Sequence, residues 1–226
     1  MKAFGLPIQA TSLAAAQKVI DKNHQDFHYL ELWVDYIDDL TVDTLTPLVN
    51  KYPGRIIIVF RRSQLDTPHM KADVRTRLLT ALADLDVLVD LDVKSQQAEL
   101  AHYNDRPRKG LLIVSFHDYQ ATPLELEAVV EAMVEFRPDI YKVATFCRDR
   151  NDALRLLELK QLLDTRGSKN IVLGMGQEGK VARIISNLWD NEIVFAPLSI
   201  SEASAPGQLT KQQMETIGDI VNEVIT

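Results

Sequence analysis

The chain contains a single cysteine, Cys147, among 226 residues, so no disulfide can form within it. Because disulfides persist mainly in oxidising compartments, we expect this protein to reside in a reducing compartment. No apolar run approaches the roughly 18 residues of a membrane span. The N-terminal stretch also lacks the long apolar segment of a signal peptide. These absences predict a cytoplasmic protein.

An excess of basic residues is also missing. The sequence has 25 Lys and Arg against 32 Asp and Glu, a formal net charge of −7. An acidic chain without a basic stripe is a poor candidate for binding nucleic acid or an anionic membrane surface. An anionic substrate would therefore need a local basic site. The hydrophobic content of 46% is ordinary for a globular protein and is enough for one substantial core.

Short apolar runs alternate with amphipathic helical stretches along the whole chain. The runs that read as strands are residues 4–10, 29–35, 55–60, 87–93, 110–116, 140–146, 170–175 and 192–198. This alternation predicts a parallel sheet with right-handed crossovers. Eight such units in 226 residues favour closure over an open, doubly wound sheet. We therefore predict an α/β fold with one domain over residues 1–226, a single (β/α)8 TIM barrel.

Two local features give sharper structural predictions. Thr122 and Pro123 precede a helical pattern, which predicts Thr122 as the N-cap and Pro123 as the first helical residue. In the second strand, side chains alternate between faces, so Glu31, Trp33 and Asp35 should share one face.

The active site of a barrel lies at the C-terminal ends of its strands, so polar residues there are candidates. Lys142 lies inside the apolar run 140–146, where a buried lysine is rare unless it is paired or functional. Burial favours its neutral amine, which can attack a ketone to form an imine. A lysine that pairs with a carboxylate, or extends to solvent, is the alternative.

His117 directly follows the run 110–116, next to the lysine strand in the predicted order. Neutral imidazole suits proton transfer near pH 7, so His117 is a candidate acid–base residue. A capping or core histidine is the alternative. Asp90 and Asp92 also interrupt a strand, but the sequence gives neither a defined role.

The segment 174–183 places Gly174, Gly176 and Gly179 in the order G-x-G-x-x-G. We do not interpret it as a dinucleotide site, because it falls on the seventh strand and no acidic strand end follows at the required spacing. A glycine-rich turn at a helix N-terminus still favours an anion. Arg183, one turn into the helix, can add a bidentate contact.

Further candidates lie at the end of the third strand and in the loop after the last one. Arg61 ends the third strand and can hold a carboxylate. Ser204 and Gln208 belong to a Gly- and Pro-bearing loop after the last strand. That loop suits a mobile lid that donates hydrogen bonds, or an ordinary turn.

Taken in order, the segments VSFHDYQATP, DIYKVATF, GMGQEGKVAR and EASAPGQ resemble the type I 3-dehydroquinate dehydratases of the shikimate pathway. The resemblance runs from about residue 27 to 210. It implies a (β/α)8 barrel that uses neither a metal nor an organic cofactor. We expect a homodimer that acts on a small molecule, with no nucleic-acid or membrane partner.

The resemblance also implies roles for the candidate residues. Lys142 would form an imine with the C3 ketone of 3-dehydroquinate, and His117 would remove a C2 proton and help to expel the C1 hydroxyl as water. Glu31 would orient His117 or bind substrate hydroxyls. The remaining contacts with substrate would come from Arg61, Arg183, Ser204 and Gln208.

Two positions depart from the family pattern. Trp33 stands where the family motif E-x-R has arginine, and Leu65 stands near a further glutamate. Trp33 is then expected to line the substrate pocket, and both changes predict weaker substrate binding. Two alternative functions remain open. One is another imine-forming barrel, such as an aldolase that cleaves a carbon–carbon bond. The other is a non-catalytic barrel that keeps the site for binding.

Overall fold

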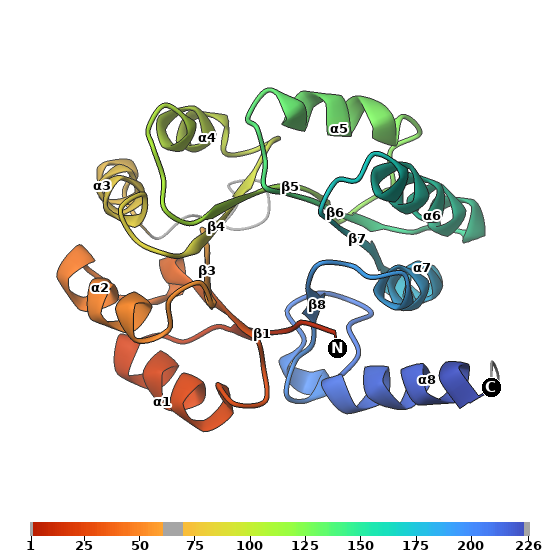
Figure 1. Cartoon of the computed structure of the whole chain (residues 1–226), viewed down its shortest axis with the longest axis horizontal. Coiled ribbons are helices and arrows are strands. Elements are labelled where there is room, and N and C mark those ends of the chain that lie inside the picture. Colours follow the sequence, from red (N-terminus) through yellow and green to blue (C-terminus); the bar gives the residue numbers. More distant parts are fainter. Residues whose placement is uncertain (1, 61–69, 224–226) are drawn as a thin grey trace.

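The computed structural model describes residues 2–60 and 70–223, in which eight parallel strands are surrounded by helices (Figure 1). The strands are β1 (Phe4–Ile8), β2 (Tyr29–Trp33), β3 (Ile56–Val59), β4 (Leu88–Asp92), β5 (Leu111–Asp118), β6 (Ile140–Phe146), β7 (Asn170–Met175) and β8 (Val194–Phe195). The helices are α1 (Leu13–Asn23), α2 (Val42–Lys51), α3 (Ala72–Leu82), α4 (Gln97–Asn104), α5 (Leu126–Val134), α6 (Arg150–Thr165), α7 (Gly176–Leu188) and α8 (Lys211–Glu223). Two short 3-10 helices, η1 (Val34–Tyr36) and η2 (Ile200–Glu202), follow β2 and β8.

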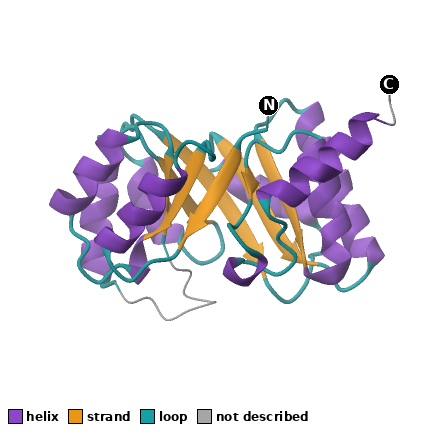
Figure 2. Cartoon of the chain, turned by 90° about the horizontal axis from the view of Figure 1, so that it is seen from below, coloured by secondary structure: helices purple, strands orange, loops and turns teal. Residues whose placement is uncertain are grey.

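The strands follow the order β7-β6-β5-β4-β3-β2-β1-β8, and each neighbouring pair is parallel. The two ends of this order, β7 and β8, approach each other, since the N–H of Glu192 donates to the carbonyl of Asn170 at 2.9 Å. Figure 2 shows the strands in the centre with helices flanking them on both sides. The predicted (β/α)8 barrel is confirmed.

Side chains of alternate strand residues point into the barrel or out toward the helices. Near the N-terminal ends of the strands the inward side chains are apolar, and they belong to a compact inner core: Ile57, Leu88, Ile113, Ile140, Ile171 and Ile193. Two or four residues further along, the inward positions of four strands are polar: Glu31, Asp90, Asp92, Ser115, His117 and Lys142. The barrel therefore has an apolar floor, and polar side chains from four strands lie above it, at the end where barrel sites lie.

The shared face predicted for Glu31, Trp33 and Asp35 holds only for the first two, whose side chains are hydrogen-bonded, and the predicted cap at Thr122 is wrong. β2 ends at Trp33 and the chain turns into η1, so Asp35 does not continue the strand face of Glu31. Helix α5 begins at Leu126 with Glu125 as its N-cap residue, not at Thr122. The Thr122 hydroxyl instead contacts the Thr145 hydroxyl at 2.8 Å and donates to the Phe146 carbonyl at 3.1 Å. A buried tertiary partner on β6 thus replaces the expected cap.

Two strands differ in length from their predicted ranges. β8 pairs over only Val194–Phe195 and then leaves the barrel wall. β5 runs on through Asp118, so His117 lies within a strand and not at the start of a turn. None of the described helices is long and apolar enough to cross a membrane.

Candidate active site

One small cavity at the C-terminal ends of the strands gathers almost all of the predicted site residues. It is lined by Glu31 and Trp33 of β2, His117 of β5, Lys142 of β6, Arg183 of α7, and Ser204 and Gln208 of the loop before α8. Arg61, the remaining predicted site residue, lies outside the described residues. Parallel strands bring these side chains together because all of their carboxyl ends meet at one rim.

Lys142 is held inside the barrel by two carboxylates. Its side chain is buried, with 4% of the residue exposed. The Nζ atom donates to Asp90 Oδ2 at 2.6 Å and to Glu31 Oε1 at 3.3 Å. It also lies 4.3 Å from the centre of the Phe195 ring. The amine is therefore fixed in position, between groups that stabilise positive charge on its nitrogen.

Each of these carboxylates has a second donor. Ser115 Oγ donates to Asp90 Oδ1 at 2.5 Å, and Trp33 Nε1 donates to Glu31 Oε2 at 3.1 Å. The hydrogen bonds of Glu31 thus run to Lys142 and Trp33.

The carboxylate beside His117 belongs to Asp92. Asp92 Oδ2 lies 3.1 Å from His117 Nδ1 and accepts the backbone N–H of His117 at 2.9 Å. The ring of Tyr119 stacks on the imidazole at a centroid distance of 6.5 Å. No role for Asp92 was predicted from the sequence. Its alternation with Asp90 in a buried strand was the available signal, because it places both carboxylates inside the barrel, where each needs a partner.

Arg183 enters the same cavity from α7. It is 2% exposed, and its Nε donates to the carbonyl of Gly174 at 3.1 Å. Burial lowers the pKa of the guanidinium to about 10, so it remains charged at neutral pH. Its Nη1 has no hydrogen-bond partner among the described residues. A buried cation with an unused donor is suited to an anionic group on a ligand.

The glycines of the segment 174–183 are explained by close packing of β7 against α7. A Cβ on Gly174 would lie 2.4 Å from the carbonyl oxygen of Gly179. Gly176 has a φ of +78°, a left-handed conformation that glycine adopts without strain. Its N–H donates to the carbonyl of Pro206 at 3.3 Å and links α7 to the loop over the site.

That loop is also held by its own predicted site residues. Gln208 Oε1 accepts the backbone N–H of Ser204 at 2.8 Å, and Gln208 Nε2 donates to Ser204 Oγ at 3.1 Å. The cavity beneath has a volume of about 30 Å³. That is room for only one or two water molecules. A ring-sized ligand needs more room than these side chains leave.

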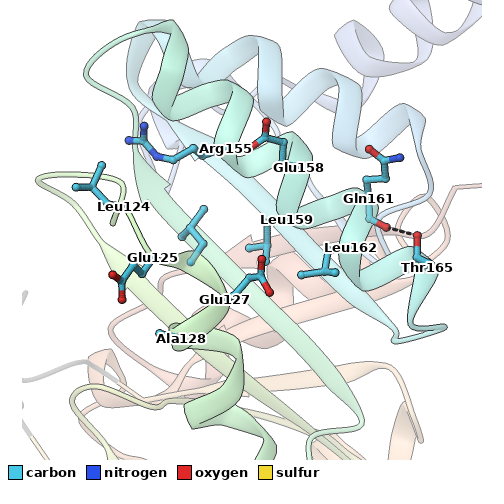
Figure 3. Close-up of a pocket in the computed structure, with 11 residues that line it drawn as sticks. Leu124, Glu125, Glu127, Ala128, Arg155, Glu158, Leu159, Gln161, Leu162 and Thr165 are labelled. Carbon is cyan, nitrogen blue, oxygen red and sulfur yellow. Dashed lines mark hydrogen bonds between the residues drawn. The ribbon is translucent and has the colours of Figure 1, made fainter.

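A larger groove lies elsewhere, on the outer surface between α5 and α6 (Figure 3). It has a volume of about 680 Å³ and is lined by residues such as Leu124, Glu127, Arg155 and Leu162. None of the predicted site residues reaches it, and Arg155 pairs with Asp152 on its own helix. Its size does not make it the reactive site, because it lacks buried, converging polar groups.

Comparison with known proteins gives one consistent result. The family model described as Type I 3-dehydroquinase matches residues 4–223. A 3-dehydroquinate dehydratase of Coxiella burnetii is 28% identical over 91% of this chain and 84% of its own length. One from Methanococcus maripaludis is 31% identical over 85% of this chain and 87% of its own length.

Among solved structures, the chain resembles the type I 3-dehydroquinate dehydratase of Clostridium difficile, determined with covalently modified comenic acid. The TM-score is 0.78 at 17% identity, and the match covers 99% of this chain and 93% of that one. At this identity the likeness shows the fold.

Proposed function

The chain belongs to the type I 3-dehydroquinase family, and from this premise we propose that it is a 3-dehydroquinate dehydratase of the shikimate pathway. Such an enzyme is a carbon–oxygen lyase that converts 3-dehydroquinate to 3-dehydroshikimate and water. The observation that carries the proposal is the buried Lys142 amine, which lines the same cavity as His117 and Arg183.

The first step is imine formation. The neutral amine of Lys142 attacks the C3 ketone, and the carbinolamine takes up a proton and loses water to give an iminium ion. Asp90, which contacts Nζ at 2.6 Å, is placed to stabilise the positive charge of the iminium. The covalent ligand named for the Clostridium difficile relative is in keeping with covalent chemistry in this family.

The second step is proton transfer by His117. The imidazole removes a proton from C2, and the electrons of that bond move into the iminium to form an enamine. The enamine then expels the C1 hydroxyl, which leaves as water with the proton from His117. Hydrolysis of the conjugated iminium releases the enone, restores the Lys142 amine and returns the proton taken up in the first step, so the net change is the loss of one water.

The remaining residues bind and enclose the substrate. The guanidinium of Arg183 binds the substrate carboxylate, with Nη1 as a hydrogen-bond donor. Glu31 accepts a hydrogen bond from a substrate hydroxyl or from Lys142. Ser204 and Gln208 close over the bound ring, with Trp33 forming one wall of the pocket. Arg61 completes this set as a proposed contact with polar groups of the substrate.

The test is to add 3-dehydroquinate to the pure protein and follow the ultraviolet absorbance of the conjugated enone. A parallel sample receives borohydride, which reduces an imine to a stable adduct, and peptide mass spectrometry locates the modified residue. We expect enone formation and a single adduct on Lys142. An adduct elsewhere, or enone without any adduct, would remove the imine mechanism.

A His117→Ala variant separates the two chemical roles. It should still form some trapped adduct on Lys142 but should lose at least about 100-fold in turnover, the usual contribution of a positioned acid–base group. Turnover close to that of the unchanged protein would make His117 a structural residue. Neither enone nor adduct in the unchanged protein at saturating substrate would favour the non-catalytic barrel, and a cleaved carbon–carbon bond would favour the aldolase alternative.

The proposal also includes a cytoplasmic homodimer. The chain has one cysteine and therefore no disulfide of its own, which is in keeping with a reducing compartment. Multi-angle light scattering on the purified chain checks the oligomeric state: a mass of about 51 kDa, twice the chain mass of 25.5 kDa, supports the dimer, and the chain mass itself rejects it.

A further inference from the structure

We propose that Asp92 is a positioning residue for the reaction: its carboxylate holds His117 in the tautomer that carries the proton on Nδ1, so that Nε2 serves as the base. The kinetic part of this inference rests on the proposed dehydratase function, whereas the tautomer can be measured without turnover.

The first argument is the geometry at Oδ2 of Asp92. This single oxygen accepts the backbone N–H of His117 at 2.9 Å and lies 3.1 Å from the ring Nδ1 of the same residue. The two contacts fix both the backbone position and the ring rotation of His117. A histidine held at the backbone and at one ring nitrogen has little freedom to turn its other nitrogen away.

The second argument is that Asp92 is itself rigidly held. Its Oδ1 accepts from the backbone N–H of Lys94 at 3.1 Å, and from the N–H and the hydroxyl of Ser95, each at 2.9 Å. Its own N–H donates to Gln96 Oε1 at 2.8 Å. Asp92 is 2% exposed, so water does not compete for these bonds. The carboxylate is therefore a fixed reference point for His117.

The third argument concerns the proton. An ionised carboxylate can only accept hydrogen bonds, so the ring nitrogen that faces it must be the one that carries hydrogen. In neutral imidazole the other nitrogen, Nε2, is then the proton acceptor. His117 also lines the cavity that contains Lys142, which is where the proposed reaction needs a base. The same logic underlies carboxylate–histidine pairs in hydrolases, where the carboxylate sets the tautomer and does not take the proton.

The direct test is nuclear magnetic resonance on protein with 15N-labelled histidine. The chain has five histidines, and the His117 signals are those missing from a His117→Ala spectrum. We expect the neutral ring of His117 to carry its proton on Nδ1. In an Asp92→Asn variant the amide oxygen should stay with the three donors of Lys94 and Ser95, so that the N–H₂ faces the ring and shifts the population toward the Nε2–H tautomer. A neutral His117 in the unchanged protein with its proton on Nε2 would overturn the inference, and this measurement does not depend on the variant folding.

The kinetic test compares two identical substitutions. Asp92→Asn should lower kcat by at least about 100-fold, while KM stays within a few-fold and borohydride still traps an adduct. The matched control is Asp118→Asn, because Asp118 also accepts two backbone N–H groups, those of Gln120 and Ala121. Within the described part of the chain, the Asp118 side chain makes no hydrogen bond to the ring of His117. The control should keep kcat within about three-fold. Equal losses in both variants would assign Asp92 a purely structural role and overturn the inference.

A double-mutant cycle completes the test. If Asp92 acts only through His117, adding Asp92→Asn to a His117→Ala background should leave turnover unchanged. A further loss similar to that of the single Asp92 variant would show that Asp92 acts on something else. Absence of dehydratase activity in the unchanged protein would reject the proposed function alone, since the tautomer measurement would still decide the role of Asp92.

Discussion

Lys142 and Asp90 are joined by a 2.6 Å hydrogen bond that reaches from β6 to β4 across the intervening strand β5. The carboxylate is completely buried, and its other oxygen accepts from Ser115 of that middle strand. The reactive amine is therefore positioned by a residue 52 positions earlier in the chain.

This relationship predicts the effect of Asp90→Asn. The substitution keeps the shape of the side chain but removes the negative charge next to the iminium. A hydrogen bond to a charged group contributes about 1.5–3 kcal/mol. We therefore expect kcat to fall roughly 10- to 100-fold, at about 1.4 kcal/mol per factor of ten. Steady-state kinetics measures the loss, and Ser115→Ala, which preserves the charge, should lose less. An Asp90→Asn enzyme as active as the Ser115→Ala enzyme would contradict the role of the charge.

Trp33→Arg should improve substrate binding. Trp33 offers one uncharged N–H, which already donates to Glu31 at 3.1 Å. An arginine in its place offers charge-assisted hydrogen bonds to substrate hydroxyls, worth about 1.5–3 kcal/mol each. We expect a dehydratase with a high KM, and a gain of roughly ten- to a hundred-fold in kcat/KM on substitution. Trp33→Phe is the control, since it keeps a ring without a donor and should show no gain. A folded Trp33→Arg variant with unchanged kcat/KM would count against the prediction.

A pair of glycine substitutions tests the packing of β7 on α7. An alanine at Gly174 would place its Cβ 2.4 Å from a backbone oxygen of Gly179, so strand and helix would have to separate. We expect Gly174→Ala to lower the free energy of unfolding by about 1–3 kcal/mol or more. A Cβ at Gly218, within α8, meets nothing within 4 Å, and Gly218→Ala should stabilise the protein by up to about 1 kcal/mol. Urea denaturation of both variants measures the difference, and equal effects would refute the packing argument.

Tyr103 gives a prediction for alkaline pH. Its hydroxyl is buried without a hydrogen-bond partner among the described residues, and burial raises its pKa to about 12 from 10.0. Between these values the unfolded chain releases the Tyr103 proton while the folded chain retains it. The folded state then binds more protons, so the free energy of unfolding falls as pH rises from about 10 to 12.

A Tyr103→Phe variant should lack this contribution to the alkaline decline. At neutral pH it should be as stable as the parent or slightly more stable, because it removes a buried polar group that makes no hydrogen bond. Urea denaturation at several pH values between neutral and alkaline gives both results. A variant that is less stable at neutral pH would show that the hydroxyl has a partner after all.

Much of the barrel could be predicted from the sequence because its information is local. The run Ile140–Phe146 is apolar and β-branched, and seven other runs repeat this pattern at regular spacing, so strand number, parallel direction and closure follow. The cap predicted at Thr122 failed for a nonlocal reason: its hydroxyl found a buried partner on β6, and no local pattern reports that partner.

The sequence by itself determined which side chains reach the rim of the barrel. The positions of Lys142 and His117 at this rim follow from strand alternation and from the rule that parallel strands end at one edge. The tertiary structure decided which of them touch. Glu31 contacts Lys142 and Trp33, whereas Asp92 contacts His117, because the stagger between neighbouring strands sets which inward positions meet. That stagger is a property of the closed barrel and not of any one strand, so pairs separated by many residues become visible only once the barrel is formed.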